Sequence, residues 1–169
     1  MENGENLENF LELFTPQPGY KILDITAHSD TLSAALLRTL APVHGRLSLA
    51  RYPGAHRELE AEEDALLHTQ DVPDFSKPFR ALPRDNDIVF IRDVLHRHAH
   101  PERILRAIYT TLANAAEVII VTETEAADTK TQLALLEKTD FRAGNVIEGI
   151  AEGVTVVMGK KMHMWGNGL

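Results

Sequence analysis

Two short, uninterrupted apolar runs constrain the fold more than any other feature of this sequence. They are Asp87–Ile91 (DIVFI) and Glu117–Thr122 (EVIIVT). Runs without a polar residue at alternate positions are typical of strands in a parallel sheet that is covered on both faces. A helix is predicted between them at Pro101–Ala113, with proline in its first turn. This strand–helix–strand order predicts a right-handed crossover between parallel strands.

The rest of the chain repeats this alternation. Further strands are predicted at Lys21–Ile25, Arg46–Ala50 and 67–72, and a closing hairpin at Asn145–Ile150 and Val154–Met158. Further helices are predicted at 5–14, Thr31–Leu40, Ala55–Leu67 and Asp128–Thr139, with Ser29 or Asp30 as the cap of the second. We therefore expect a three-layer α/β fold, with a Rossmann-like, mostly parallel sheet that ends in an antiparallel hairpin.

Length and charge narrow the organisation and the partners. The 169 residues fit one domain, 1–169, in which 1–19 form an amino-terminal helical brace. A net charge of −8 argues against nucleic acid as a partner, and no apolar run reaches the ~20 residues that cross a bilayer. The acidic amino terminus and the absence of cysteine favour a cytoplasmic protein without disulfides or thiolate metal sites.

Three stretches carry a resemblance to a known family: KILDI at 21–25, NDIVFIRDVLHRHAHPERILRAIYTTLANAAEVIIVTE at 86–123, and LLEKTDFRAGNVIEG at 135–149. With the order of elements, they make residues 20–160 resemble the class I S-adenosylmethionine-dependent methyltransferases. The resemblance implies S-adenosylmethionine as cofactor and, in an active enzyme, a small-molecule methyl acceptor. The cofactor would lie over Asp24–Asp30, outside the carboxyl end of the first strand.

The resemblance also assigns residues to the cofactor site, and several depart from the family pattern. The three glycines of the family's first loop correspond to Thr26, His28 and Asp30. Side chains there either occupy ligand space or strain the backbone. Arg51 follows the second strand, where the family places a ribose-binding carboxylate, and an arginine cannot accept the hydroxyl protons. Asp71 is compatible with the family's adenine-side acid.

Asp93 and His96 are the predicted catalytic residues, because the resembling turn after the fourth strand faces the acceptor. His96 would take a proton from the nucleophile.

Two other chemical patterns lie in the predicted loops. His96, His98 and His100 alternate as metal ligands could, but they lie in a turn before Pro101, where their side chains need not converge, so no metal site is predicted. His28 and Asp30 could form a dyad, for which no nucleophile can be assigned.

Two functions therefore remain open. One is a methyltransferase that holds its cofactor in an altered pose. The other is a protein inactive in methyl transfer that keeps the sheet and binds a partner or itself, as a homodimer, through an apolar surface at Met162, Met164 and Trp165. Packing of these three side chains against the amino-terminal helix is the alternative for that surface.

Overall fold

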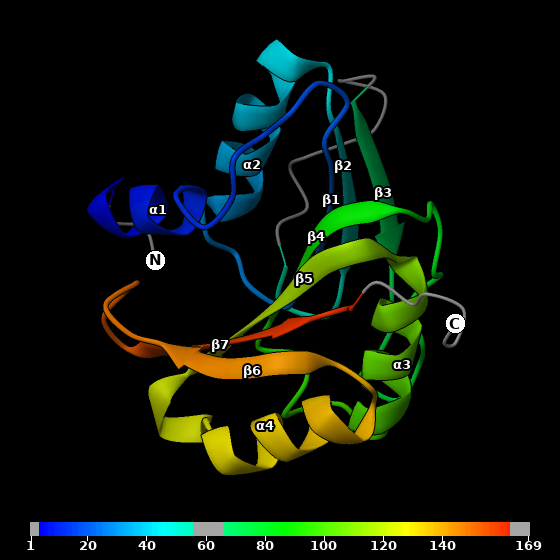
Figure 1. Cartoon of the computed structure of the whole chain (residues 1–169), viewed down its shortest axis with the longest axis vertical. Helices are drawn as coiled ribbons and strands as arrows, with labels where there is room; N and C mark the ends of the chain where they lie inside the picture. The colour runs from blue at the N-terminus through cyan, green and yellow to red at the C-terminus, as the bar shows by residue number, and fades with distance from the viewer. Residues whose placement is uncertain (1–3, 56–65, 163–169) are drawn as a thin grey trace.

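A single mixed sheet organises the computed structural model, which describes residues 4–55 and 66–162 (Figure 1). The strands are β1 Lys21–Thr26, β2 Arg46–Arg51, β3 Leu67–Asp71, β4 Asn86–Arg92, β5 Leu112–Glu123, β6 Arg142–Ile147 and β7 Val154–Lys160. The helices are α1 Gly4–Leu11, α2 Leu32–Leu40, α3 Pro101–Thr111 and α4 Thr129–Lys138, with short 3-10 helices at Ala41–Val43 and Thr124–Ala126.

The strand order is β3-β2-β1-β4-β5-β7-β6. The strands from β3 to β5 run parallel, and β7 is antiparallel to both β5 and β6. The order of the strands across the sheet reverses beside β1: β2 and β3 follow on one side of β1, and β4 and β5 follow on the other. The predicted fold class, including the closing hairpin, is confirmed.

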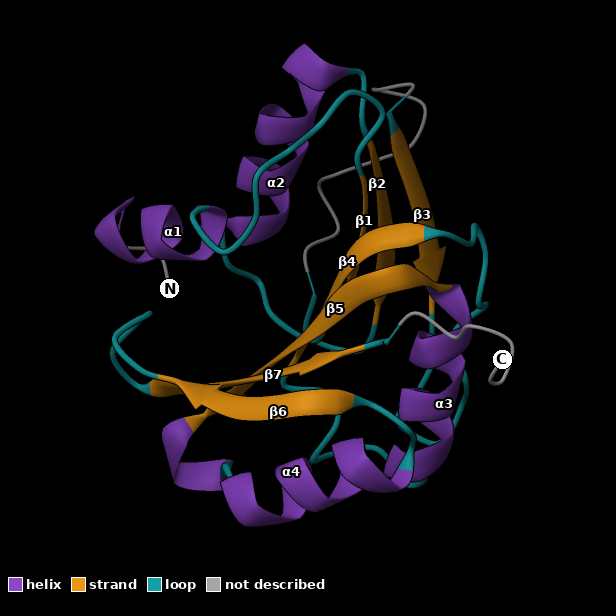
Figure 2. Ribbon diagram, in the orientation of Figure 1, coloured by secondary structure: helices purple, strands orange, loops and turns teal. Residues whose placement is uncertain are grey.

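Helices cover both faces of this sheet, as Figure 2 shows. On one face α1 and α2 pack against the sheet, with Phe10, Leu36 and Phe90 in the same buried cluster. On the other face, α3 and α4 pack against the sheet, with Ile104, Ile120 and Leu136 in a second buried cluster. Both faces of β4 and β5 are therefore buried, which is why their sequences read as continuous apolar runs. None of the described helices is long and apolar enough to pass through a membrane.

Two strands begin several residues before their predicted starts. Strand β5 begins at Leu112, five residues before the apolar run, because Ala115 and Ala116 exchange backbone hydrogen bonds with Lys161 and so extend the pairing with β7. Strand β6 begins at Arg142, before a register shift that ends at Asn145. The segment predicted as a helix at Ala55–Leu67 lies mostly outside the described residues.

Candidate functional site

The carboxyl ends of four neighbouring strands place a row of polar residues across the sheet. Thr26 of β1 is in register with Arg51 of β2 and Arg92 of β4, and Arg51 is in register with Asp71 of β3. Residues in register on parallel strands point to the same face. The row therefore lies where ligands bind in open α/β sheets.

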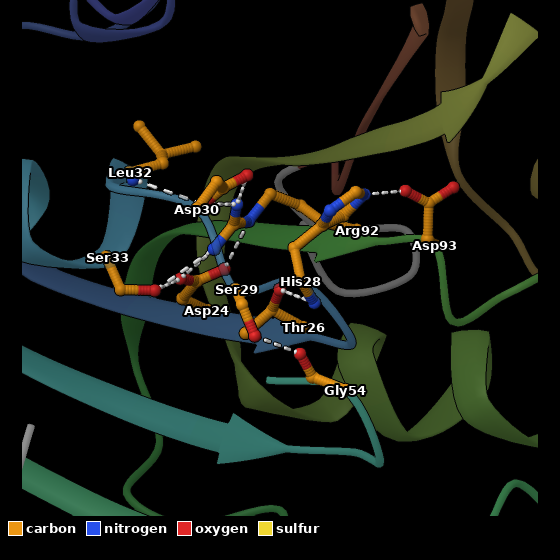
Figure 3. Close-up of polar contacts among 10 residues, drawn as sticks. All are labelled: Asp24, Thr26, His28, Ser29, Asp30, Leu32, Ser33, Gly54, Arg92 and Asp93. Atoms are coloured by element: carbon orange, nitrogen blue, oxygen red, sulfur yellow. Dashed lines mark hydrogen bonds and ion pairs between the residues drawn. The ribbon is translucent and has the colours of Figure 1, made fainter. Parts of the chain in front are cut away.

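Arg92 is the centre of a buried ion-pair network on the face that α2 covers (Figure 3). Its Nε and Nη2 donate to the two carboxylate oxygens of Asp24, at 3.0 and 2.9 Å. Its Nη1 donates to both oxygens of Asp30, at 2.6 and 2.7 Å. The Ser33 hydroxyl of α2 donates to Asp24 at 2.6 Å and lies 3.0 Å from the Arg92 Nη2.

This network is closed to water. Arg92 and Asp24 are fully buried and Asp30 is nearly so. Burial alone would lower the pKa of Arg92, but the charges of Asp24 and Asp30 outweigh it and raise that pKa, so the guanidinium stays charged. Hydrogen bonds from a buried guanidinium to two carboxylates hold the arginine side chain in one orientation.

The start of α2 depends on the same network. Thr31 is at the N-cap position and its side chain makes no capping hydrogen bond. The N–H of Leu32 donates instead to Oδ1 of Asp30 at 3.1 Å. Of the two predicted caps, Asp30 therefore bonds the helix start, whereas the Ser29 hydroxyl donates to the Gly54 carbonyl at 2.5 Å.

The loop after β1 has an ordinary backbone at the three positions that correspond to the family's glycines. None of Thr26, His28 and Asp30 has a positive φ. The Thr26 hydroxyl accepts a hydrogen bond from the His28 N–H at 3.0 Å. The predicted backbone strain is therefore absent, and what these residues contribute is side-chain volume and hydrogen bonds.

The loop after β2 packs directly on the loop after β1. Gly54 has φ +106, and a Cβ at this position would lie 2.5 Å from the carbonyl oxygen of Ala27. Only glycine tolerates both this conformation and this approach. The two loops are thus in contact beside the end of β1.

His28 forms an ion pair with Asp93, the residue that follows β4, through Nε2 and Oδ2. The other Asp93 oxygen accepts a hydrogen bond from the Glu123 N–H at 2.8 Å. The hydrogen bond with Asp93 raises the pKa of His28 against the opposing effect of burial. Burial would raise the pKa of Asp93, but the hydrogen bonds from His28 and from the Glu123 backbone outweigh it and lower that pKa.

These contacts correct one sequence-based alternative. His28 and Asp30 do not form a dyad, because Asp30 is bonded to Arg92 and His28 to Asp93. Figure 3 shows that the two side chains point in different directions: Asp30 toward Arg92, the last residue of β4, and His28 toward Asp93, the residue after that strand.

Arg51 and Asp71 bond to each other across neighbouring strands. The Arg51 Nε and Nη2 donate to the two Asp71 oxygens at 2.8 and 3.3 Å. The Arg51 side chain is buried, whereas 57% of the Asp71 side chain is exposed. The carboxylate predicted near adenine is thus engaged with the arginine predicted near ribose.

The three alternating histidines lie in different surroundings. His96 is exposed, and its charge helps to lower the pKa of Asp93. His98 is buried, with Nδ1 accepting from the His100 N–H at 2.9 Å and Nε2 lying 3.2 Å from the Lys77 carbonyl. His100 is exposed, and its ring centroid lies 6.2 Å from that of His98.

Sequence reasoning missed three residues of this site: Arg92, Ser33 and Glu123. An arginine that ends an otherwise apolar buried strand needs a counter-charge, so Arg92 was a detectable signal. Ser33 and Glu123 carry no comparable signal, because a serine in a first helical turn and an exposed acid at the end of a strand are both common.

Comparison with solved structures shows what this architecture resembles. The chain has the fold of class I S-adenosylmethionine-dependent methyltransferases. A TehB-like SAM-dependent methyltransferase from Corynebacterium glutamicum superposes with a TM-score of 0.71 and 14% identity, covering 94% of this chain and 89% of that one. A SAM-dependent methyltransferase from Aquifex aeolicus gives 0.66 and 15%, with 95% of each chain covered.

A third structure, human N-acetylserotonin methyltransferase in complex with SAM, gives a TM-score of 0.62 and 14% identity over 94% of this chain and 52% of that one. The chain likewise spans about half of the CurJ carbon methyltransferase structure, at 51%. No protein-family model and no curated protein matches the sequence. At these identities the likeness defines the fold alone.

The residues at the sheet's carboxyl edge do not fit S-adenosylmethionine in the mode that the resemblance implies. The acid of β1, Asp24, is bonded to Arg92 and Ser33. A cationic group stands at Arg51, where the ribose hydroxyls would need an acceptor. The site's own side chains thus satisfy one another.

Proposed function

We propose that this chain is inactive as a methyltransferase and acts as a binding protein, through self-association or a protein partner. The observation that supports this most is the Arg92 network, in which the β1 acid and the residue at the third glycine position share one buried guanidinium. Moving either carboxylate toward a ligand would leave a buried charge uncompensated, which costs about 3–5 kcal/mol.

The Arg51–Asp71 pair supports the same proposal at the other end of the site. A ribose would have to displace Asp71 from the buried Arg51 side chain, and the arginine offers it no acceptor. Both halves of the expected cofactor surface are thus engaged within the protein.

Thermal melting with S-adenosylmethionine and S-adenosylhomocysteine tests this proposal. A ligand at ~100 times its dissociation constant stabilises a protein by about 2.7 kcal/mol, which raises the melting temperature by a few degrees. We expect no shift with either compound, while a structural neighbour that binds the cofactor, melted alongside, should shift. A shift of several degrees in this protein would end the proposal.

Sedimentation velocity tests the binding role. A weight-average mass that rises with protein concentration is expected for self-association, and Met162, 44% exposed after β7, is the described part of the predicted surface. Met164 and Trp165 lie outside the described residues. A protein that stays monomeric at high concentration and captures no partner contradicts the role, and a Met162→Ser variant that associates unchanged excludes that surface.

The second candidate is a methyltransferase that acts on a small molecule with the cofactor in an altered pose. The exposed Asp71 carboxylate at the end of β3 favours it, since it could turn toward an adenine. The expected signature is a melting shift that survives His28→Ala and disappears in Asp71→Ala. A shift lost in both variants, or in neither, contradicts that pose.

A further inference from the structure

A second group of side chains at the carboxyl edge of the sheet is not part of the Arg92 network. It consists of His28 from the loop after β1, Asp93 at the end of β4 and Glu123 at the end of β5. One ligand atom from each lies within 4.8 Å of the other two. Three adjacent strands in the order β1-β4-β5 thus bring one imidazole and two carboxylates together.

We propose that His28, Asp93 and Glu123 bind a divalent transition-metal ion, with Zn²⁺ as the reference ion. One imidazole nitrogen and two carboxylate oxygens are ligands that zinc, manganese and cobalt accept. Metal–ligand distances of about 2.0–2.2 Å place the ligand atoms of such an ion roughly 3–3.5 Å apart, within the observed spread. His28 and Asp93 contact each other directly, so an ion would enter between them.

Hydrogen bonds to the backbone orient two of these ligands, Asp93 and His28. Asp93 has φ 53, and its N–H donates to the Val121 carbonyl at 2.8 Å. Its Oδ1 is engaged by the Glu123 N–H, which directs Oδ2 toward His28. The His28 backbone is tied to the Thr26 hydroxyl. Such supporting hydrogen bonds orient the ligands of metal sites.

The local charge also suits a cation. Two carboxylates and a neutral imidazole carry −2, and Arg92, whose charge acts on His28, is neutralised by Asp24 and Asp30 on the helix-covered face. The Asp93 side chain is 7% exposed, the His28 side chain 24%, and Glu123 is exposed. An ion there would keep open positions for water or a ligand, as three-ligand sites do.

This inference does not rest on the proposed function, because it concerns different side chains and needs no cofactor. Absence of S-adenosylmethionine binding leaves the metal site untouched. A failed metal test likewise leaves the Arg92 network as described, so the two can be distinguished.

Binding of Zn²⁺ to the full chain, stripped with a chelator, is the test. Isothermal titration should give one ion per chain, and Co²⁺ in the same site should show the visible absorption of a nitrogen- and oxygen-ligated ion without thiolate charge transfer, since the chain has no cysteine. Glu123→Gln and His28→Gln should each weaken Zn²⁺ binding at least about 100-fold, beyond the 10–100-fold loss that outer partners cause.

Matched variants separate this site from surface binding. Glu125→Gln changes an exposed acid two residues from Glu123, and His96→Gln changes an exposed histidine near Asp93; both should bind Zn²⁺ as the parent does. Glu123 is exposed, so its variant should melt like the parent in chelator and decides the question if His28→Gln does not fold. A stoichiometry other than one, or affinity unchanged in Glu123→Gln, overturns the proposal.

Discussion

Two arginines end the strands on either side of β1, and their surroundings differ sharply. Arg92 on β4 is enclosed by α2 and by two carboxylates that are themselves buried. Arg51 on β2 is equally buried, but its partner Asp71 is mostly exposed. Water can solvate Asp71 if Arg51 is lost, whereas Asp24 is fully buried and would keep only the Ser33 hydroxyl among the partners described above. Arg92 therefore stabilises the interior of the fold, whereas Arg51, in the same row, pairs with an acid at the border of the site.

Arg92→Met is the strongest test of this difference. It leaves two carboxylates in the interior without a cation and should lower the free energy of unfolding by about 3–5 kcal/mol, measured by urea denaturation. The triple variant Asp24→Asn, Asp30→Asn, Arg92→Met removes all three charges and should recover part of that loss. If Arg92→Met and Arg51→Met cost the same, the comparison is wrong.

The pair of His28 and Asp93 should show an intermediate effect that depends on pH. The contribution of His28 to the free energy of unfolding is complete below the ordinary histidine pKa of 6.5. It is lost as pH rises through the raised pKa that His28 has in the folded state. The part from Asp93 is complete above its ordinary pKa of 3.8 and is lost as pH falls through the lowered one. The contribution is therefore largest between these two ordinary values.

Asp93→Asn measures that contribution. In chelator at pH 5 it should cost about 1.5 kcal/mol, the lower end for a charged hydrogen bond, because His28 is partly exposed. Asparagine can still accept the Glu123 N–H, so the variant keeps that backbone hydrogen bond and removes both the charge and the oxygen that faces His28. The difference from the parent should shrink toward pH 9, and a difference that is constant with pH would assign the effect to packing alone.

The fold was largely predictable because its signals are local. The runs at β4 and β5 declare strands buried on both faces, and Pro101 marks where α3 begins. The site was predictable only in part, since its partners are distant in sequence: Arg92 lies 68 residues from Asp24 and 62 from Asp30. A single sequence names the charged residues, but which of them meet depends on strand register and on how α2 packs.

Asp71→Asn should have a smaller effect than any of these, about 0.5–1 kcal/mol, because the charge that is lost is 57% exposed and the asparagine oxygen can still accept a hydrogen bond from the buried Arg51. Asp30→Asn is the matched control, since it makes the same change in a carboxylate that is nearly buried and bonded to Arg92. We expect the control to cost several times more in the same urea titration. Equal losses would mean that exposure of the acid does not decide the strength of these pairs.

The exposed ion pairs of Glu102 should contribute the least to the stability of the protein among the ion pairs compared. Glu102 accepts from Arg106 at 3.1 Å and from Lys138 at 3.2 Å, so it makes as many ion pairs as Arg92 does, but all three side chains are at least 39% exposed. Lys138→Gln breaks one of these pairs without disturbing the acid in the first turn of α3, and should reduce stability less than Asp71→Asn. High salt should abolish this small loss because water and ions already screen the pair, and should leave the Arg92→Met loss intact. If salt diminished both losses alike, burial would not be what separates the Arg92 network from the other ion pairs of this chain.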